Sequence, residues 1–343
     1  DVEIRYRKRY LDLIVNPNVK EVFLNRSKII TLMREYLDKL QFVEMETPLL
    51  QTVYGGAAAK PFKTKLNYFD MQVFLSVSPE LYLKRLIVGG FERVYTICKN
   101  FRNEGIDSMH NPEFTMIELY QSYVDYNAIM ELTESMIEHI AKKVNGTTKS
   151  AYRGKEIDFK KPWTRMTMKE ALKKIGKIDV DALNDAALKK KCKELKIDLT
   201  HDTRDFMIVS LFDELVQEQL VQPTFITDYP LEVCPLTKVH RKNPQLVERF
   251  EAFVCGTELA NAYSELTDPV EQRKRFQKQL EEKKEKEDAH LMVNELDEDF
   301  LESMEVGLPP LGGLGIGVDR LVMLLTGQGS LKDAILFPFM KPS

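Results

Sequence analysis

The chain lacks the features of a membrane protein and of a protein held together by disulfides or zinc. None of its apolar runs approaches the roughly 20 residues that a membrane-spanning helix needs. It has only four cysteines, at positions 98, 192, 234 and 255, and no two of them form a close pair. That spacing argues against a zinc site and a disulfide framework, and it favours a reducing compartment. We therefore expect a globular protein of the cytoplasm.

Two common nucleotide-binding motifs are also missing. No Walker A sequence occurs anywhere in the chain. Glycines at positions 313, 315 and 317 alternate, but their spacing does not fit Gly-x-Gly-x-x-Gly, and no strand–helix–strand unit with a later acid follows. A Rossmann fold is therefore rejected, and any nucleotide site must be built in another way.

Positive charge is scarce for a protein that binds nucleic acid. The chain has 49 lysines and arginines against 53 aspartates and glutamates, a formal net charge of −4. Nucleic-acid-binding domains are usually basic, because neutralising phosphates drives their affinity. The length of 343 residues and the hydrophobic content of 43% suit one large globular domain or two ordinary ones.

The most informative segment is a pair of alternating, strand-like runs at residues 94–104 and 113–120. The loop between them is too long for a two-residue turn, so we expect a hairpin with a functional loop. In the first run, a period of two places Arg102 and Glu104 on one face. In the second run, the same period places a phenylalanine, a glutamate and a tyrosine on a shared face: Phe114, Glu118 and Tyr120.

An ordinary hairpin with a solvated polar face is the alternative interpretation of these runs. A merely solvated face rarely needs aromatic residues among its charges, so we favour a site. A second arginine, Arg320, lies far away in the chain. Two separated arginines together with paired acids suggest a site that holds an anionic nucleotide and a cationic substrate.

The position of Arg320 supports this interpretation independently. It lies in the first turn of a helix predicted over residues 319–325 and ended by Gly327. A cation there opposes the helix dipole by a few tenths of a kcal/mol or more. Such a misplaced charge suggests an anionic partner.

A second hairpin is predicted at residues 250–258, with a tight Cys-Gly turn. If Val254 pairs with Thr257, then Glu251 and Glu258 become diagonal neighbours on one face, within reach of a shared cation. Hard oxygen ligands beside a nucleotide imply Mg²⁺. The alternative interpretation is that both acids are simple surface residues.

Most of the remaining chain is predicted to be helical. Residues 19–40 and 128–143 have helical periodicity, and residues 271–288 form a dense mixed-charge helix. A strand bounded by turns is expected at residues 222–233. Residues 150–220 carry no motif, and we expect a mostly helical insertion there, with a short strand or two at its start.

One further helix is predicted to begin near Ser78 and to end at the Gly-Gly pair at positions 89 and 90. Ser78 can cap the helix and Pro79 suits its first position. Glu80 then lies in the first turn, where the helix dipole favours an acid. A helix-start role for Glu80 is therefore the alternative to a binding role.

Several of these segments resemble the motifs of the class II aminoacyl-tRNA synthetases. Residues 101–104 and 110–120 resemble motif 2, and residues 312–325 resemble motif 3. Residues 40–49 resemble motif 1, an element of the dimer interface, although Gln41 stands where that motif usually has a glycine. Several motifs in family order are far more specific than one short motif.

Other segments resemble the lysyl-tRNA synthetases in particular, namely residues 5–13, 55–57, 78–84 and 258–266. The resemblance covers the whole chain, residues 1–343. It implies one catalytic domain of α+β class, an antiparallel sheet flanked by helices, which forms a homodimer. Members of that family carry an N-terminal anticodon-binding OB-fold, and we expect this chain to correspond to the catalytic domain without it.

The resemblance implies a function. Lysine would be activated with ATP to lysyl-adenylate and then transferred to the 3′-terminal adenosine of tRNA(Lys). Two alternatives remain: a lysine ligase acting on elongation factor P, whose family resembles this domain and lacks the OB-fold, and a catalytically inactive paralogue that serves as a binding module. Residues 55–57 and 5–13 favour the synthetase, and the intact arginines and acids argue against an inactive paralogue.

The resemblance also assigns roles to residues. It implies an ATP site made of Arg102, Glu104, His110, Phe114, Glu251 and Arg320, with Mg²⁺ bound by Glu251 and Glu258. Within that site Glu104 contacts the adenine amino group, His110 lies near the distal phosphates and Phe114 stacks on adenine. The two arginines are the catalytic residues, because a carboxylate attacking phosphorus needs charge neutralisation rather than a general base.

For lysine, the resemblance implies a pocket made of Gly56, Glu80, Arg102, Glu118, Tyr120, Asn261 and Glu265. Glu80 and the Gly56 backbone would hold the α-amino group, Glu265 with Tyr120 the ε-ammonium, and Asn261 would help with the carboxylate. Strict alternation puts Asn261 and Glu265 on the face opposite Glu258. We therefore expect a β-bulge near Ala260.

Overall fold

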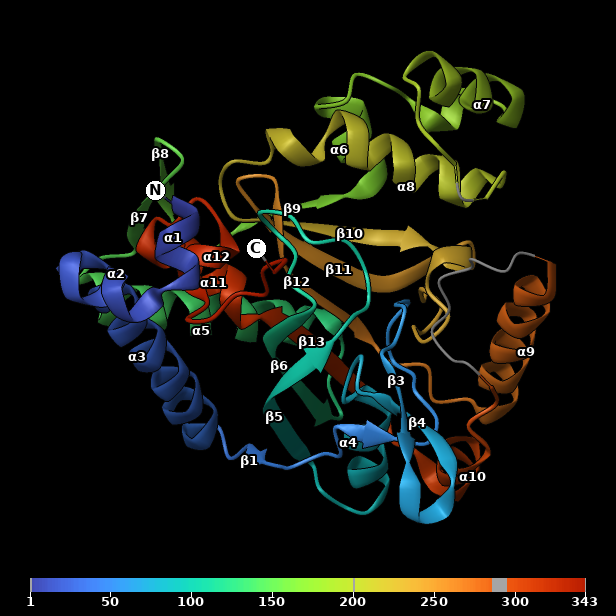
Figure 1. The fold of residues 1–343 in the computed structure, drawn as a ribbon. Helices are drawn as coiled ribbons and strands as arrows, with labels where there is room; N and C mark the ends of the chain where they lie inside the picture. The colour runs from blue at the N-terminus through green and yellow to red at the C-terminus, as the bar shows by residue number, and fades with distance from the viewer. Residues whose placement is uncertain (1, 200, 286–294, 343) are drawn as a thin grey trace.

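A computed structural model describes residues 2–199, 201–285 and 295–342. Its centre is an eight-stranded sheet in the order β1-β5-β6-β13-β12-β11-β10-β9 (Figure 1). These strands are β1 (Val43–Glu44), β5 (Arg93–Phe101), β6 (Glu113–Ser122), β9 (Thr164–Thr167), β10 (Thr224–Pro230), β11 (Leu246–Val254), β12 (Thr257–Ser264) and β13 (Leu311–Gly317). All pairs are antiparallel except the two at the edges, β1 with β5 and β10 with β9. The predicted α+β class is confirmed.

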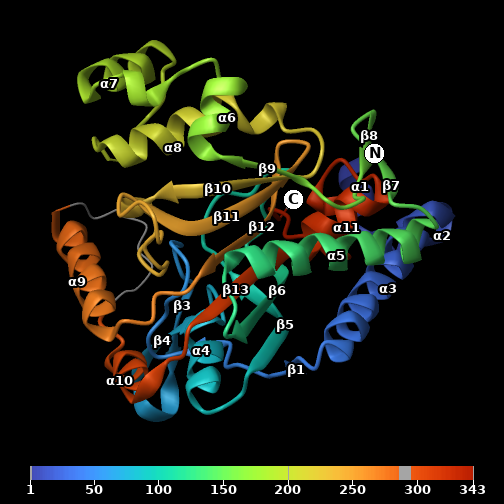
Figure 2. The ribbon, with the colours of Figure 1, turned by 180° about the vertical axis from the view of Figure 1, so that it is seen from behind.

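The back of this sheet packs against helices to form the main core. Figure 2 shows α5 (Tyr126–Asn145) lying across it, with α3 (Pro17–Lys39) and α11 (Val318–Thr326) beside it. Strand β6 shows how its residues divide between the two faces. Ile117 and Leu119 are fully buried against these helices, while the alternate side chains point to the other face. That other face carries the site.

The predicted helices at 19–40 and 128–143 are confirmed as α3 and α5. Helix α3 ends at Lys39 with Leu40 as its C-cap, and Gln41 after it has φ +63°. A residue with a side chain costs roughly 1–2 kcal/mol in this left-handed conformation. Glycine, the usual residue of motif 1 at this position, adopts this conformation without strain. Gln41 adopts the same turn at a cost in conformational energy.

Helix α4 (Glu80–Val88) begins one residue later than predicted, with Pro79 as its N-cap. Proline has no side-chain acceptor, so the Ser78 hydroxyl accepts the backbone N–H of Glu80 instead, at 3.1 Å. Glu80 still lies in the first turn, and the helix ends at Gly89 as predicted. The predicted strand at 222–233 is β10, followed by the short η4 turn (Leu231–Val233).

The region 149–220 contains the short hairpin β7 (Lys149–Tyr152) and β8 (Lys155–Asp158), strand β9, and helices α6 (Met168–Lys174), α7 (Asp185–Glu194) and α8 (Arg204–Leu215). Its three helices gather at one end of the molecule, beyond β9 and β10 (Figure 1). They share a core in which Leu211 and Phe212 pack with Phe253 of β11. The assignment of residues 150–220 as an insertion stays a prediction.

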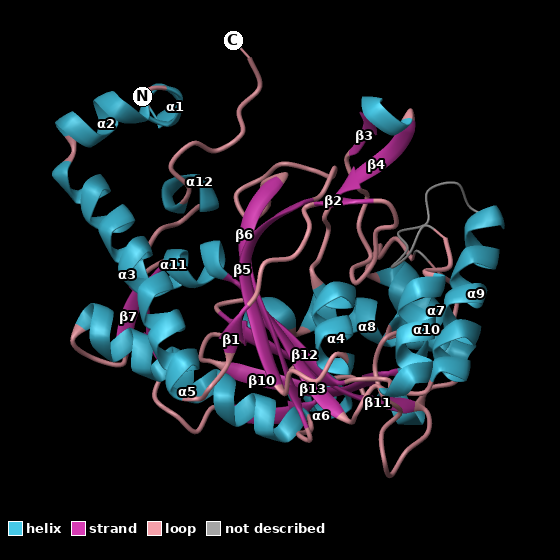
Figure 3. Ribbon diagram, turned by 90° about the horizontal axis from the view of Figure 1, so that it is seen from below, coloured by secondary structure: helices cyan, strands magenta, loops and turns pink. Residues whose placement is uncertain are grey.

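Smaller elements surround the sheet. A second sheet of order β2-β4-β3 is made by β2 (Leu50–Gln51), β3 (Lys63–Leu66) and β4 (Met71–Leu75). Figure 3 shows it on the side away from the N-terminal helices α1 (Val2–Arg7) and α2 (Arg9–Val15).

Helix α9 (Pro269–Glu285) confirms most of the helix predicted at 271–288, whose last three residues lie outside the described ranges. Helix α10 is Glu298–Gly307. Within the described residues, no helix is long and apolar enough to span a membrane.

A buried arginine joins the two ends of the described chain. Arg9 is 1% exposed and donates to the carbonyl oxygens of Lys332 and Leu336, at 2.7 and 3.0 Å. It also forms an ion pair with buried Asp12 at 2.6 Å. The N-terminal helices are thereby held against α12 (Leu331–Ala334), which in turn bonds the loop between β5 and β6 through Leu331 and Ser108.

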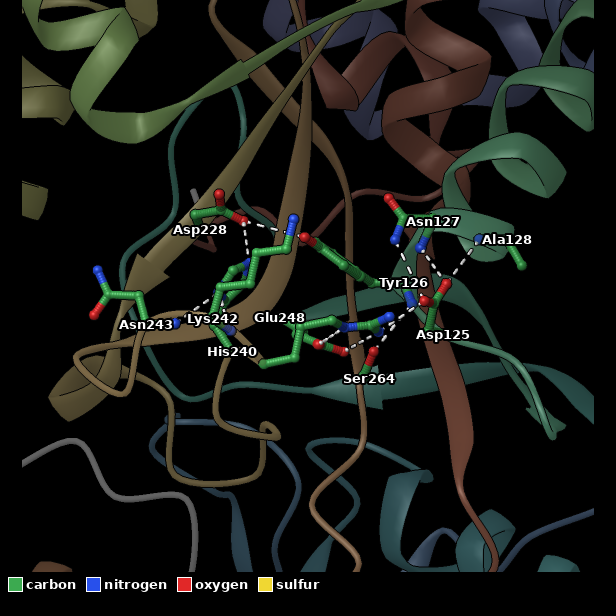
Figure 4. Close-up of polar contacts among 11 residues, drawn as sticks. Asp125, Tyr126, Asn127, Ala128, Asp228, His240, Lys242, Asn243, Glu248 and Ser264 are labelled. Carbon is green, nitrogen blue, oxygen red and sulfur yellow. Dashed lines mark hydrogen bonds and ion pairs between the residues drawn. The ribbon is translucent and has the colours of Figure 1, made fainter.

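A polar network lies on the back of β11 and β12 (Figure 4). It anchors the segment around Arg241, which follows residues 234–237 at the wall of the front cavity. Arg241 pairs with fully buried Glu248 at 2.5 Å and with Asp125, the N-cap of α5, at 2.8 Å. Ser264 accepts the backbone N–H of Tyr126 at 3.0 Å. These contacts join the loop that carries Arg241 and the start of α5 to β11 and β12.

Candidate active site

The front face of the sheet carries a cavity of about 420 Å³. It is bounded by β6, β11, β12 and β13, by the loop between β5 and β6, and by the start of α4. Every residue predicted for the site lines it: Gly56, Glu80, Arg102, Glu104, His110, Phe114, Glu118, Tyr120, Glu251, Glu258, Asn261, Glu265 and Arg320. The structure therefore brings the candidates together, while the role of each stays a prediction.

The predicted hairpin of β5 and β6 is confirmed, with Phe101 opposite Glu113 as its last pair. One detail of the prediction for this hairpin was wrong. Arg102 and Glu104 do not lie on a strand face, because β5 ends at Phe101 and both residues belong to the loop. They reach the cavity as the chain leaves the sheet, where no alternation applies. Phe114, by contrast, lies on β6 as predicted.

Arg102 is held over the Phe114 ring, with its guanidinium carbon 5.1 Å from the ring centroid. Burial lowers the pKa of Arg102, although the nearby carboxylates of Glu104 and Glu258 oppose that shift. Its Nε has no hydrogen-bond partner among the described residues. A desolvated cation with an unused donor is suited to bind an anion.

The alternating glycines of β13 have a steric reason. Gly313 lies opposite Tyr120 in the sheet, and Gly315 lies opposite Glu118. A Cβ on Gly313 would meet Glu265 Oε1 at 2.1 Å and the Tyr120 ring at 2.5 Å. Glycine at position 313 therefore leaves room for the acid and the ring of the neighbouring strands.

The second predicted hairpin is confirmed in its register. Val254 pairs with Thr257, and the turn residues Cys255 and Gly256 have φ values of +48° and +71°. The predicted bulge is confirmed as well: Ala252 pairs with Ala260 but Phe253 pairs with Glu258, so one residue, Leu259, is extra. The strand thus turns Asn261 and Glu265 to the same cavity as Glu258.

The two acids of that hairpin are each engaged with an arginine. Glu251 accepts from Arg249 at 2.5 Å and from the Tyr229 hydroxyl at 2.8 Å, and burial raises its pKa to about 7. Glu258 contacts Arg320 at 3.2 Å. The pairing of Arg249 was not predicted, although its position two residues before Glu251 puts both side chains on one face.

Motif 2 and motif 3 are also tied together by a residue that the prediction missed. Asp319, buried beside Arg320, accepts the backbone N–H of Thr115 at 2.7 Å and forms an ion pair with Arg26 of α3 at 2.5 Å. This contact fixes the start of α11, and with it Arg320, against β6. Exposed His110 contacts Asp107 at 2.8 Å within the loop.

The innermost end of the cavity is strongly acidic. Glu80, Glu118 and Glu265 are all at most 5% exposed. Glu118 accepts from the Ser78 hydroxyl at 2.8 Å, and burial together with the charge of Glu80 raises its pKa to about 8. Lys84, one turn after Glu80 on α4, contacts Glu80 at 2.6 Å and Glu265 at 2.5 Å.

Lys84 was not among the predicted site residues. The only signal in the sequence is its position four residues after Glu80 on a helix, a spacing that permits an ion pair. Burial alone would lower the pKa of Lys84, but the carboxylates of Glu265 and Glu80 raise it, so the ammonium stays charged. The contact with Glu265 joins residues that are far apart in the chain.

The raised pKa of Glu118 predicts how stability depends on pH. The unfolded carboxyl releases its proton near its ordinary value of 4.5, whereas the folded one keeps it up to about 8. The free energy of unfolding should therefore fall as pH rises through this window. Glu118→Gln should flatten that fall, which thermal melting of the ligand-free protein from about pH 5 to pH 8 would measure. Exposed Glu113 of the same strand supplies the control, Glu113→Gln, and equal slopes in wild type and Glu118→Gln would contradict the prediction.

The chain was compared with known proteins. The family described as tRNA synthetases class II (D, K and N) matches residues 1–341. The lysine–tRNA ligase of Clostridium novyi is 53% identical over the whole of this chain, which covers 68% of that protein. Those of Thermoanaerobacter sp. and Carboxydothermus hydrogenoformans are 52% and 51% identical, again over the whole chain, which covers 68% and 70% of them. Matches of this extent, together with the cavity described above, show that the chain belongs to the class II tRNA synthetases of the D, K and N group.

Proposed function

We propose that this protein is a lysine–tRNA ligase, as its relatives are named. It would join the carboxylate of lysine to the α-phosphorus of ATP with release of pyrophosphate, and then transfer the lysyl group to the 3′-terminal adenosine of tRNA(Lys). One observation carries the proposal. The cavity has three buried carboxylates at its inner end and two arginines, Arg102 and Arg320, on its walls, so it complements a substrate with two amino groups beside a polyphosphate.

The first step needs no general base, because the lysine carboxylate is already ionised. An oxygen of that carboxylate would form the new bond to the α-phosphorus while the bond to the pyrophosphate oxygen breaks. Arg102 lies where it could bind the carboxylate and the α-phosphate together, and its unused Nε supports such a role. Arg320 would bind the γ-phosphate, and both cations would offset the charge that develops.

The adenosine end of ATP would lie over Phe114. Adenine would stack on this ring, and the Arg102 guanidinium, 5.1 Å from the ring centroid, would then lie close to the α-phosphate of the same nucleotide. Glu104 would accept from the adenine amino group, and His110 would lie near the distal phosphates. The loop position of both residues supports this assignment, since a loop can close on the nucleotide once it has bound.

Lysine would lie at the acidic end of the cavity. Glu80 and the Gly56 backbone would hold its α-amino group, and Asn261 would help with its carboxylate. Gly56 has φ +89°, and a Cβ there would lie 2.8 Å from Glu80, so the close approach needs glycine. Glu265 and Tyr120 would hold the ε-ammonium, with Glu118 beside them.

The function is tested by lysine-dependent exchange of pyrophosphate into ATP, followed by charging of tRNA(Lys). Exchange without charging, together with lysine transfer to elongation factor P, would favour the protein-modifying ligase instead. Absence of exchange in folded protein would favour an inactive paralogue. A panel of the other amino acids serves as the control for exchange, because aspartate and asparagine lack a second amino group.

The residues present also fit Mg²⁺. Glu251 and Glu258 offer hard oxygen donors in the cavity, and no group of three or more potential protein ligands occurs among the described residues. Two carboxylates completed by phosphate oxygens and water are the usual set for a nucleotide-bound Mg²⁺. We propose that these acids hold Mg²⁺, which would neutralise phosphate charge.

We expect Glu251→Gln and Glu258→Gln each to raise the Mg²⁺ concentration needed for pyrophosphate exchange by at least about tenfold. The reason is the loss of an anionic oxygen ligand. A magnesium titration of exchange rates measures the effect. Glu156→Gln, on the exposed β8 hairpin, is the control variant. Unchanged magnesium dependence in both glutamate variants would remove them as ligands.

Substrate selection should depend on Glu265. Truncating one partner of a buried charge pair costs roughly 2–5 kcal/mol, which is about 30-fold to several-thousand-fold in affinity. Glu265→Gln should therefore weaken lysine far more than ATP, and Arg320→Ala should do the reverse. Glu80→Gln should weaken lysine and norleucine equally, because both have the α-amino group. If Glu265→Gln kept the preference for lysine over norleucine, Glu118 would take the role instead.

We also propose a homodimer through motif 1, residues 39–50. Support comes from its exposed apolar side chains, Leu40, Val43, Leu49 and Leu50. A two-fold interface would place this patch of both subunits face to face and cover it. Sedimentation at micromolar concentration should give a dimer, and Leu50→Asp should shift it to monomer. A monomeric wild type would contradict the proposal.

A further inference from the structure

Lys84 is a buried cation to which the chemistry above gives no role. It is 0% exposed, and its Nζ lies 2.6 Å from Glu80 Oε1 and 2.5 Å from Glu265 Oε2. Both carboxylates line the cavity, but Lys84 does not. Its ammonium therefore lies behind the two acids and does not occupy the space that a substrate would use.

Among the described residues, Lys84 is the cation that both Glu80 and Glu265 contact. The rings of Tyr120 and Tyr263 each lie 5.8 Å from Nζ. The Tyr263 hydroxyl donates to the second oxygen of Glu80 at 2.8 Å. In the described part of the chain, the ion pairs of Glu80 and Glu265 are both made with Lys84.

Glu265 has one carboxylate oxygen that a ligand could contact. One of its oxygens binds Lys84, while the other, Oε1, is buried without a hydrogen-bond partner among the described residues. Burial raises the pKa of Glu265, and the charge of Lys84 lowers it. Lys84 thus favours the ionised carboxylate, which is the form that an ammonium ligand needs.

We propose that Lys84 is a positioning residue for amino-acid selection. By binding Glu80 and Glu265 through a single nitrogen, it fixes the separation of the two carboxylates that receive the α- and ε-amino groups, so that the pocket measures the length of a diamino acid. This inference rests on the proposed function.

The test compares Lys84→Met with wild type in lysine-dependent pyrophosphate exchange, with ornithine as a probe one methylene shorter. The variant keeps an unbranched side chain and removes the charge. We expect KM for lysine near neutral pH to rise at least about tenfold, which corresponds to about one pKa unit in the acids it supports. KM for ATP should stay unchanged, and the preference for lysine over ornithine should fall.

The pH profile separates positioning from a merely structural role. Without Lys84, the groups that face its position, Glu80, Glu118 and Glu265 with Tyr120 and Tyr263, form a cluster without a cation, so its carboxyls should hold their protons to higher pH. The optimum for lysine KM should move upward by about one pH unit. A variant with lower melting temperature but unchanged KM, preference and profile would overturn the proposal.

Arg85→Met is the matched control on the same helix. Arg85 follows Lys84 directly but pairs with Asp297 and Asp299, which lie outside the cavity. It should weaken the packing of α4 without changing selection or the pH profile. A wild type with no lysine-dependent exchange would instead refute the proposed function, and the two failures are therefore distinguishable.

A second variant keeps the test decisive if Lys84→Met does not fold. Lys84→Met combined with Glu265→Gln removes one charge of each sign and leaves the net charge of the cluster unchanged. Because the contact with Glu265 is already lost in Glu265→Gln, only the part of the effect that passes through Glu80 remains, so KM for lysine in the double variant should exceed that of Glu265→Gln by less than about tenfold. A further loss of tenfold or more would mean that Lys84 acts independently, and the proposal would fail.

Discussion

Three carboxylates buried at one end of a cavity are the constraint on which this site depends. Burying an unpaired charge is costly, and three like charges side by side are costlier still. The fold offsets that cost in different ways. Lys84 pairs with both Glu80 and Glu265, while Glu118 takes hydrogen bonds and has its pKa raised to about 8. The negative charge that remains would favour a substrate with amino groups, as proposed above.

The sheet makes this arrangement possible because its back face packs against helices and its front face carries the cavity. The back face packs on α5 and α11 and is anchored by the network around Arg241 and Glu248. The front face is hollow where β13 passes between β6 and β12, since Gly313 leaves room for Glu265. The packed back face and the glycine at position 313 on the front face together leave space for a cavity lined by charged groups.

The opposite pole of the cavity is positive, and it is fixed by contacts between distant segments. Asp319 ties the start of α11 to β6 and to α3, which holds Arg320 in place. Arg102 rests on Phe114, which lies on the same strand, β6, as Glu118. The inner end of the cavity thus carries three carboxylates, whereas at the other end Arg102 and Arg320 lie beside the acids Glu104 and Glu258.

The bulge near Ala260 was expected only because the family resemblance places Asn261, Glu265 and Glu258 in one site. The sequence alone determined other parts of the local geometry: both hairpins, the Cys-Gly turn and the first-turn positions of Glu80 and Arg320. These follow from alternation, turn chemistry and capping, which act between near neighbours. It misplaced Arg102 and Glu104, because periodicity cannot tell where a strand stops. Only the tertiary structure decided that Lys84 meets Glu265 and that Asp319 meets Arg26. Those pairs depend on which helices and strands lie side by side, and a buried charge is costly unless an opposite charge lies beside it.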